Sequence, residues 1–333
     1  MKVELLFEEI AKLKVAVVGD IMLDTYWWGH VERISPEAPV PVVALEKKEN
    51  RMGGAANVAL NTISLGAETS LFSVTGDDEE AELLLHIMQE AQIDTKYIVK
   101  SRERVTTNKT RIISRNQQMM RLDSEITTEI NSDDEQLLLD RFTNYVKRYK
   151  PDVVIFEDYN KGVLKASVIS AFISVCKENN IVTAVDPKRK NFFAFTDVDI
   201  FKPNLKEVKE ALNLLIEDID EKALQQIHKQ LNEKLHHKIS LITLSEKGMF
   251  VQKGTSSAII PTHVRNVADV SGAGDTVIAV ASVVYAATKN TQLSADIANI
   301  AAGIVCEEVG TAAIDKARLL HECKTLVPAL STL

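Results

Sequence analysis

The chain has 333 residues, 45% of them hydrophobic, which is enough for one large α/β domain or two smaller ones with a sizeable core. Its net charge of −8 disfavours general binding to nucleic acid or to an anionic membrane, so any phosphate site must be built locally. The sequence holds no apolar run near the roughly 18 residues of a membrane span. The first residues lack the pattern of a signal peptide, and the three cysteines form no C-x-x-C pair. These features predict a soluble cytoplasmic protein.

Short β-branched runs that end in polar residues alternate with helical patterns along most of the chain. The predicted strands cover residues 14–20, 152–162, 181–188, 199–204 and 239–248. Apolar side chains at three and four spacing predict helices over residues 133–150, 164–180 and 221–238. Such alternation is typical of a doubly wound, mostly parallel α/β sheet, whose ligands lie outside the carboxyl ends of the strands.

Two segments interrupt this alternation. Residues 38–54 and 106–123 have the pattern of β hairpins without helices. We expect them to form a small β lid inserted in a single domain that spans residues 1–333. No linker, repeat or low-complexity stretch in the sequence separates two units.

The stretch NVADVSGAGDTVIAV, residues 266–280, places two glycines directly before an apolar run with helical character. A flexible loop at a helix N-terminus favours phosphate, because free N–H groups and the helix dipole both attract an anion. The dinucleotide fingerprint fails, since Val277 stands where its third glycine is needed, and no G-x-x-x-x-G-K-[ST] loop is present. The amides of Gly272, Ala273 and Gly274 could instead stabilise a phosphoryl group in transfer while Asp275 takes a proton from the attacking alcohol. The alternative is a plain helix start, with Asp275 stabilising the dipole.

Two long stretches resemble the signatures of the ribokinase-like (PfkB) family of sugar kinases. GGAANVALNTISLG at 53–66 is similar to the N-terminal signature, and DVSGAGDTVIA at 269–279 is similar to the C-terminal one. The resemblance implies a Rossmann-like α/β fold with a β lid, and a catalytic base at Asp275. It implies ATP and Mg²⁺ and allows a monovalent cation such as K⁺. It also implies a homodimer that pairs through the lids, whose open edges need cover.

Within this family, further stretches resemble the kinase half of the bifunctional bacterial proteins of ADP-heptose synthesis. These stretches are residues 17–43, 114–123, 157–162 and 185–192. The resemblance implies phosphorylation of the anomeric C1 hydroxyl of D-glycero-β-D-manno-heptose 7-phosphate to the 1,7-bisphosphate, a precursor of lipopolysaccharide core heptose. Because no two of the seven histidines have H-x-G-H spacing, no nucleotidyltransferase domain is expected. Two alternatives stay open, namely another acceptor (a fructose phosphate, ribose or a nucleoside) and a non-catalytic sugar-nucleotide binding module.

Candidate sugar ligands follow the first predicted strand and begin the helix after residue 54. A carboxylate at a strand end can accept two hydroxyls, and the resemblance assigns the sugar contact to Asp20, with Asp24 as a second candidate or a turn or helix cap. Gly53, Gly54 and Asn57 offer N–H groups and an amide to the ring, unless the glycines serve tight packing alone.

The substrate's 7-phosphate needs cations, and four basic residues cluster in or near the second lid segment. They are Lys109, Arg111, Arg115 and Arg121, and the first three are expected to share one strand face, which could also be a solvated edge. Asp158 in EDYNKG is expected to bind sugar hydroxyls or to organise water on Mg²⁺, with turn formation as the alternative.

The nucleotide-binding candidates come only from the resemblance. Asn204 and Glu207 match the family's N-x-x-E motif, which is linked to nucleotide phosphate and hydrated Mg²⁺, so Glu207 is a metal candidate through water. Helix capping by Asn204 is the competing interpretation. The segment TLSEKG and two later positions match residues beside the phosphates and around adenine, namely Thr243, Ser245, Gly248, Asn299 and Gly310.

Overall fold

The larger of two β-sheets forms the centre of the molecule. The computed structural model describes residues 2–115, 117–215 and 219–327. The sheet has nine strands in the order β13-β12-β11-β10-β9-β8-β1-β4-β5, and all neighbours from β11 to β5 run parallel. Its strands are β1 (Lys14–Gly19), β4 (Glu68–Gly76), β5 (Ile98–Ser101), β8 (Val153–Glu157), β9 (Val182–Asp186), β10 (Ile200–Phe201), β11 (Ile239–Thr243), β12 (Met249–Lys253) and β13 (Ser256–Ile260). This arrangement confirms the predicted fold class.

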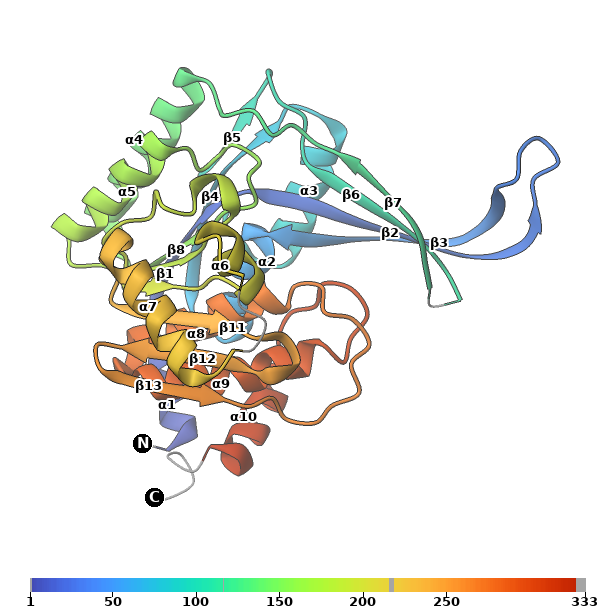
Figure 1. Ribbon diagram of the computed structural model, residues 1–333. Helices are drawn as coiled ribbons and strands as arrows, with labels where there is room; N and C mark the ends of the chain where they lie inside the picture. Colours follow the sequence, from blue (N-terminus) through green and yellow to red (C-terminus); the bar gives the residue numbers. More distant parts are fainter. Residues whose placement is uncertain (1, 116, 216–218, 328–333) are drawn as a thin grey trace.

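Helices cover both faces of this sheet (Figure 1). Alternate residues of β1 point to opposite sides, so that Val15 and Val17 join one buried core while Ala16 and Val18 join the other. The first core is covered by α1 (Val3–Ile10), α2 (Ala55–Ser64), α3 (Glu79–Glu90), α8 (Ala273–Thr288), α9 (Thr291–Val305) and α10 (Lys316–Leu326). The second is covered by α4 (Ser132–Tyr149), α5 (Ala166–Glu178), α6 (Leu205–Ala211) and α7 (Glu221–Leu235). Among the described residues, no helix is both long and apolar enough to cross a membrane.

The smaller sheet has four strands in the order β3-β2-β6-β7 and projects from the main body, with the β2–β3 hairpin reaching furthest (Figure 1). Its strands are β2 (Ile21–Ile34), β3 (Pro41–Gly54), β6 (Asn108–Ser114) and β7 (Gln117–Ser124). The sequence analysis missed β2, which supplies the antiparallel partner of β3 and the parallel partner of β6. The two expected lid segments are therefore joined through a strand that follows β1 directly.

The carboxyl ends of the parallel strands meet where the small sheet leaves the body. Asp20 follows β1, Asp158 follows β8, Lys188 lies two residues beyond β9, and Lys202 follows β10. Because parallel strands end at one edge, these residues lie along the same side of the sheet, and Lys188 and Lys202 line one pocket with the first turn of α8.

Candidate active site

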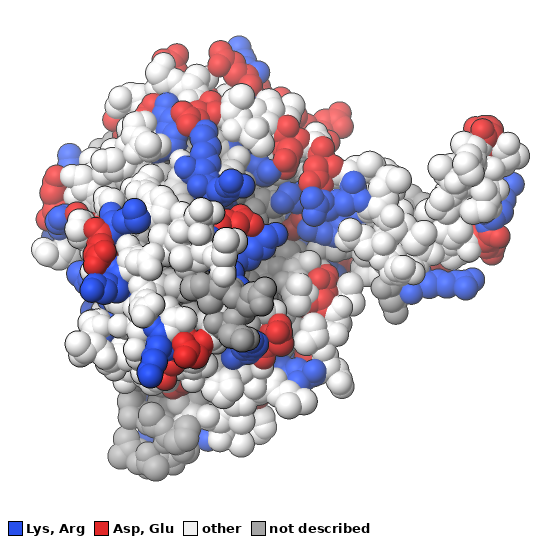
Figure 2. Space-filling view, viewed as in Figure 1, with Lys and Arg blue, Asp and Glu red and all other residues white. Residues whose placement is uncertain are grey.

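A pocket of about 1330 Å³ opens at this edge of the sheet. It is lined by residues that follow β9, β10 and β11, by the segment 262–270 and by the start of α8. Figure 2 shows Lys and Arg side chains gathered along the hollow beside the root of the small sheet, although the chain as a whole is acidic. The local positive charge suits an anionic ligand.

Asp275 lies in the first turn of α8 and is 2% exposed. Its Oδ2 accepts a hydrogen bond from the Asn57 side chain at 2.9 Å, and its Oδ1 accepts one from the Tyr159 hydroxyl at 2.7 Å. Burial raises the pKa of Asp275 to about 6, while the two hydrogen bonds oppose that rise. A carboxylate with a pKa near neutrality, held by two donors beside a pocket, is suited to take up a proton.

The glycines before Asp275 let the chain pass close to its neighbours. Gly272 caps α8 with φ of +78°, and a Cβ there would lie 2.9 Å from the amide nitrogen of Asn57. Gly274 is helical, and a Cβ there would meet Asp186 and Lys202 at 3.5 and 3.6 Å. Gly272, Ala273 and Gly274 all line the pocket, at the end of the helix whose first N–H groups have no partner within the helix.

Carboxylates and lysines form the floor beneath this turn. Glu157, Asp186 and Asp275 each place an oxygen within 4.8 Å of the other two. Lys202 pairs with Asp186 at 2.7 Å and is 2% exposed, and Lys188 pairs with the same carboxylate at 3.3 Å. Burial favours a raised pKa for Asp186, but the two ammonium groups lower it. By contrast, burial and the neighbouring carboxylates raise the pKa of Glu157 well above its usual value.

Glu157 is fully buried, and neither of its carboxylate oxygens has a hydrogen-bond partner among the described residues. A buried acidic group without partners costs free energy unless it is protonated or binds a cation. Oxygen atoms of this kind are the ligands that Mg²⁺ prefers. The donor set therefore fits a divalent cation carried with a nucleotide.

Asn204 and Glu207 form a capping box at the start of α6. The Asn204 side chain accepts from the backbone N–H of Glu207, and the Glu207 side chain accepts from the backbone N–H of Asn204, each at 2.8 Å. The capping interpretation of Asn204 is thus present in the structure. The other oxygen of Glu207 binds Lys188 at 2.9 Å, which connects this helix start to Asp186.

Four other predicted nucleotide residues, Thr243, Ser245, Gly248 and Asn299, line the pocket. Gly310 lies at a different place. Its N–H donates to Asp269, and a Cβ at Gly310 would lie 2.7 Å from the hydroxyl of Tyr26 in the small sheet. Gly310 therefore sits against the root of the small sheet and not among the residues that line the pocket.

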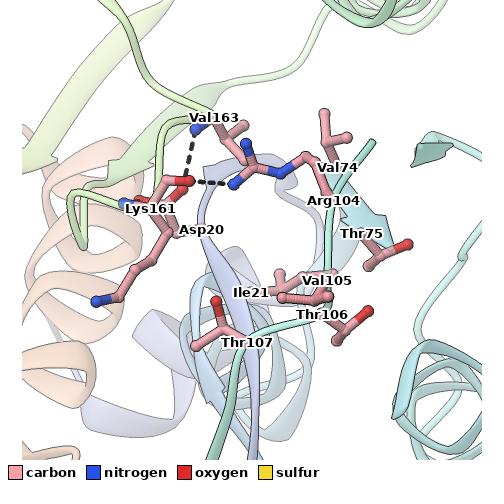
Figure 3. A pocket seen from close by; sticks show the side chains of 10 residues that line it. All are labelled: Asp20, Ile21, Val74, Thr75, Arg104, Val105, Thr106, Thr107, Lys161 and Val163. Carbon is pink, nitrogen blue, oxygen red and sulfur yellow. Dashed lines mark hydrogen bonds between the residues drawn. The ribbon is translucent and has the colours of Figure 1, made fainter. Parts of the chain in front are cut away.

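The carboxylate of Asp20 is fully occupied by the loop after β8. It accepts backbone hydrogen bonds from Tyr159 at 2.8 Å, Lys161 at 3.0 Å and Val163 at 3.1 Å. Figure 3 shows Asp20 pointing at this loop, beside a cavity of about 10 Å³ that Arg104 also lines. This geometry shows that Asp20 holds the loop after β8, and its contact with sugar stays a prediction.

Asp158 is also committed within the protein. Its two oxygens accept from the backbone N–H of Asn160 at 2.7 Å and from the Asn191 side chain at 3.0 Å. Burial raises the pKa of Asp158 to about 7. The alternative of turn formation is present in the structure, and the contact of Asp158 with sugar or metal-bound water stays a prediction.

The second candidate sugar ligand near the first strand is Asp24. It lies in β2, not in a turn or a helix cap, and its carboxylate pairs with Arg111 of β6. A Cβ at Gly53 would lie 2.4 Å from its Oδ2, so only glycine leaves room for this carboxylate. Gly54 caps α2 with φ of +60°, and Asn57 in the first turn of α2 reaches Asp275.

The four basic candidates of the small sheet divide into two pairs. Arg111 binds Asp24, and the Lys109 ammonium lies 5.4 Å from the ring centre of Tyr159, so both face the body. Arg121 is exposed and pairs with Asp123 at 2.8 Å. Arg115 is exposed in the turn after β6 with φ of +47°, so it lies outside the strand and does not share the strand face of Lys109.

The sequence analysis did not single out Tyr159, Glu157 or Lys202. Tyr159 and Lys202 line the pocket, and Glu157 lies below it. The order of the strands could have revealed Glu157 and Lys202, because the last residues of neighbouring parallel strands lie side by side. Glu157 and Asp186 are register partners at the ends of β8 and β9, and Lys202 follows the Phe201 partner of Val185.

Comparison with known proteins agrees with this geometry. The family described as pfkB family carbohydrate kinase matches residues 12–317. Bifunctional protein HldE of Geobacter sulfurreducens is 38% identical over 319 residues, which cover 96% of this chain and 64% of that protein. The chain thus spans just under two thirds of the length of that relative.

Two solved structures have the same fold at low sequence identity. Phosphofructokinase-2 from Escherichia coli in complex with potassium has a TM-score of 0.77 at 14% identity, covering 96% of this chain and 99% of the other. Ribokinase of Arabidopsis thaliana complexed with ribose and ATP has a TM-score of 0.71 at 17% identity, covering 93% and 99%. The chain belongs to the pfkB family of carbohydrate kinases, which are phosphotransferases that use ATP.

Proposed function

We propose that this kinase transfers the γ-phosphoryl group of ATP to the C1 hydroxyl of D-glycero-β-D-manno-heptose 7-phosphate, giving the 1,7-bisphosphate for ADP-heptose synthesis. The observation that carries the kinase chemistry is the buried Asp275, held by Asn57 and Tyr159 beside the glycine turn of α8. The choice of heptose phosphate is supported by the 38% identity to a bifunctional HldE protein and by the basic residues of the small sheet.

In the proposed reaction the oxygen of the C1 hydroxyl attacks the γ-phosphorus of ATP, and Asp275 accepts the proton of that hydroxyl. The bond between the γ-phosphorus and the oxygen that bridges to the β-phosphate breaks, and ADP leaves. The N–H groups of the turn from Gly272 to Gly274 would stabilise the negative charge of the transferring group, and that of Ala273 would first have to leave the carbonyl oxygen of Val270, to which it donates at 3.3 Å. Because Asp275 is buried, water competes little for its proton.

Mg²⁺ is assigned to the floor of the pocket, at Glu157 and Asp186. Both carboxylates are buried, and the unpartnered oxygens of Glu157 offer ligands. Glu207 is less suited, because its two oxygens already accept from Asn204 and Lys188. When bound, Mg²⁺ would neutralise phosphate charge. A monovalent cation such as K⁺ remains part of the proposal by analogy with the potassium complex of the bacterial phosphofructokinase-2.

The sugar phosphate is assigned to the face of the small sheet that turns toward the body. Asp24 would accept sugar hydroxyls, and Lys109 and Arg111 would meet the 7-phosphate. Arg121 on β7 is the register partner of Arg111, and Arg115 lies in the turn after β6. Both are exposed and are secondary candidates.

We also propose a homodimer in which the small sheets of two copies pair. Large apolar side chains are exposed on this sheet, including Ile34 at 60%, Met120 at 56% and Leu122 at 48%. Water-exposed apolar side chains on a projecting sheet favour cover by a second copy. Sedimentation of a Met120→Glu, Leu122→Glu double variant should show monomers, with Leu137→Glu on α4 as the control. A dimer that persists in the double variant would overturn this part.

The deciding experiment incubates the protein with ATP, Mg²⁺ and heptose 7-phosphate and identifies the product by mass and phosphorus NMR. A 1,7-bisphosphate is expected. The same assay on Asp275→Asn should show turnover lower by about two orders of magnitude or more with ATP binding retained, because the base is lost. Asp315→Asn, an exposed cap residue of α10, serves as the matched control.

A substrate panel separates the remaining alternatives. Preference for a fructose phosphate, ribose or a nucleoside would replace the heptose assignment while keeping the kinase. If none of the acceptors stimulated ATP consumption, the alternative of a non-catalytic sugar-nucleotide binding module would be favoured. Full turnover in Asp275→Asn would remove Asp275 as the base.

A further inference from the structure

Tyr159 connects the base to a loop that the family signatures do not include. It follows Asp158 in the loop after β8, and its hydroxyl donates to Oδ1 of Asp275 at 2.7 Å. Its side chain also lines the pocket. Since Asn57 donates to the other oxygen, the two donors together fix the plane of the Asp275 carboxylate.

The loop that carries Tyr159 is anchored from below. Asp20 accepts hydrogen bonds from the backbone N–H groups of Tyr159, Lys161 and Val163. Arg104 donates to the carbonyl oxygen of Lys161 in the same loop, and Figure 3 shows Arg104 beside Asp20, Lys161 and Val163. Three hydrogen bonds to one buried carboxylate leave the backbone around Tyr159 little freedom. Asp20, directly after β1, therefore fixes the backbone position from which the Tyr159 hydroxyl reaches Asp275.

The ring of Tyr159 has a cation near it from each side of the site. The Lys109 ammonium of the small sheet lies 5.4 Å from the ring centre, and the Lys188 ammonium beside the acidic floor lies 5.2 Å from it. Cations over an aromatic ring are attracted by its π electrons, and they make its hydroxyl a stronger donor. Tyr159 thus contacts the proposed sugar-phosphate side, the nucleotide side and the base.

We propose that Tyr159 is a positioning residue whose hydrogen bond orients the carboxylate of Asp275 toward the acceptor hydroxyl. This inference rests on the proposed role of Asp275. Tyr159 acts through Asp275 and takes no proton itself. The phenol donates to one oxygen and Asn57 to the other, so the carboxylate cannot rotate without breaking a hydrogen bond.

Other charged groups also face Asp275, and their effects must be separated from that of Tyr159. Glu157 at the end of β8 and Asp186 at the end of β9 carry or can carry negative charge close to it, whereas Lys188 and Lys202 carry positive charge. Burial raises the pKa of Asp275 to about 6, Asn57 and Tyr159 lower it, Asp186 raises it and Lys188 lowers it. Removing only the phenol oxygen leaves all of these other groups in place.

The test is Tyr159→Phe, which keeps the ring between the two lysines and deletes the donor. Because Asn57 alone would then hold the carboxylate, kcat should fall by about tenfold through lost orientation. KM for ATP should change less than about twofold. Tyr145→Phe, in the aromatic core that α4 forms with Phe72, is the matched control and should leave kcat and KM unchanged.

A second readout does not depend on turnover. The carboxyl ¹³C signal that disappears in Asp275→Asn should have a different chemical shift in Tyr159→Phe and in the native protein at one fixed pH, because one of its two hydrogen bonds is gone. If Asp275→Asn is inactive but Tyr159→Phe retains the native kcat and the native chemical shift, the inference fails and the proposed base stands. If Asp275→Asn keeps its turnover, the base assignment fails, and the role of Tyr159 falls with it.

Discussion

The two glycines of the turn before Asp275 should respond in opposite ways to the same added methyl group. Gly272 has φ of +78°, and a Cβ there would lie 2.9 Å from the Asn57 amide nitrogen. Gly274 is helical, and its Cβ would make only ordinary contacts at 3.5 Å and beyond. Each substitution is Gly→Ala two residues apart, so one variant is the control for the other.

For Gly272→Ala the left-handed backbone costs about 1–2 kcal/mol of the free energy of unfolding. Displacement of Asn57 adds about 1.5 kcal/mol or more if its hydrogen bond to the Asp275 carboxylate is lost. For Gly274→Ala the gain in helix propensity is about 0.5–1 kcal/mol. The two variants should therefore differ by at least about 2 kcal/mol.

Urea unfolding of both variants and the native protein measures this difference, with slopes compared to confirm that the midpoints report stability. Steady-state kinetics should show a lower kcat in Gly272→Ala, because Asn57 no longer holds Asp275. If the two variants had equal free energies of unfolding, the argument that only glycine fits at position 272 would be refuted.

Three buried charged or titratable groups give further expectations. Arg111→Met should raise KM for the sugar phosphate by about tenfold or more and leave KM for ATP within about twofold, because it deletes a cation that pairs with a buried carboxylate in β2. Arg33→Met on the exposed arm is its control, and an unchanged sugar KM would contradict the assignment. Burial lowers the pKa of His237 to about 3. Because an unfolded histidine titrates near about 6.5, the unfolded chain binds more protons below that pH, and stability should fall by about 1.4 kcal/mol per pH unit as pH drops from there toward the folded value. Urea titrations should show a shallower fall for His237→Gln, and equal slopes would argue against this source. Lys202→Met removes one of two ammonium groups beside Asp186 and should destabilise by about 3–5 kcal/mol, whereas a loss below about 1 kcal/mol in urea would show that the other ammonium suffices.

The alternation of strands and helices was readable from the sequence because each element has one dominant period. The helices α4, α5 and α7 lie within a few residues of the predicted ranges. The strand β2 was not predicted, because charged and apolar side chains mix along IMLDTYWWGHVERI. Such mixing is expected for a β-ribbon that leaves the body of the protein and is exposed toward its tip. Its aromatic and β-branched content was the available signal.

Residue identity at a strand end predicted where polar groups gather but not which oxygens are free. Asp20 and Asp24 have the same side chain four residues apart. The first is saturated by three backbone donors of a loop about 140 residues later, and the second faces a cation from β6. Those partners depend on tertiary packing, so the local pattern could not predict that one carboxylate holds a loop and the other pairs with an arginine.

The cluster of Glu157, Asp186 and Lys202 could have been predicted from the order of the strands, although not from spacing along the chain. Once the order β10-β9-β8 is assumed, parallel register places Glu157 beside Asp186, and Lys202 follows the register partner of Val185. A buried row of two carboxylates with a lysine at one end is costly unless its charges are matched. The lysine satisfies Asp186 but leaves Glu157 without a partner among the described residues, and that imbalance is what favours a cation carried in with the nucleotide.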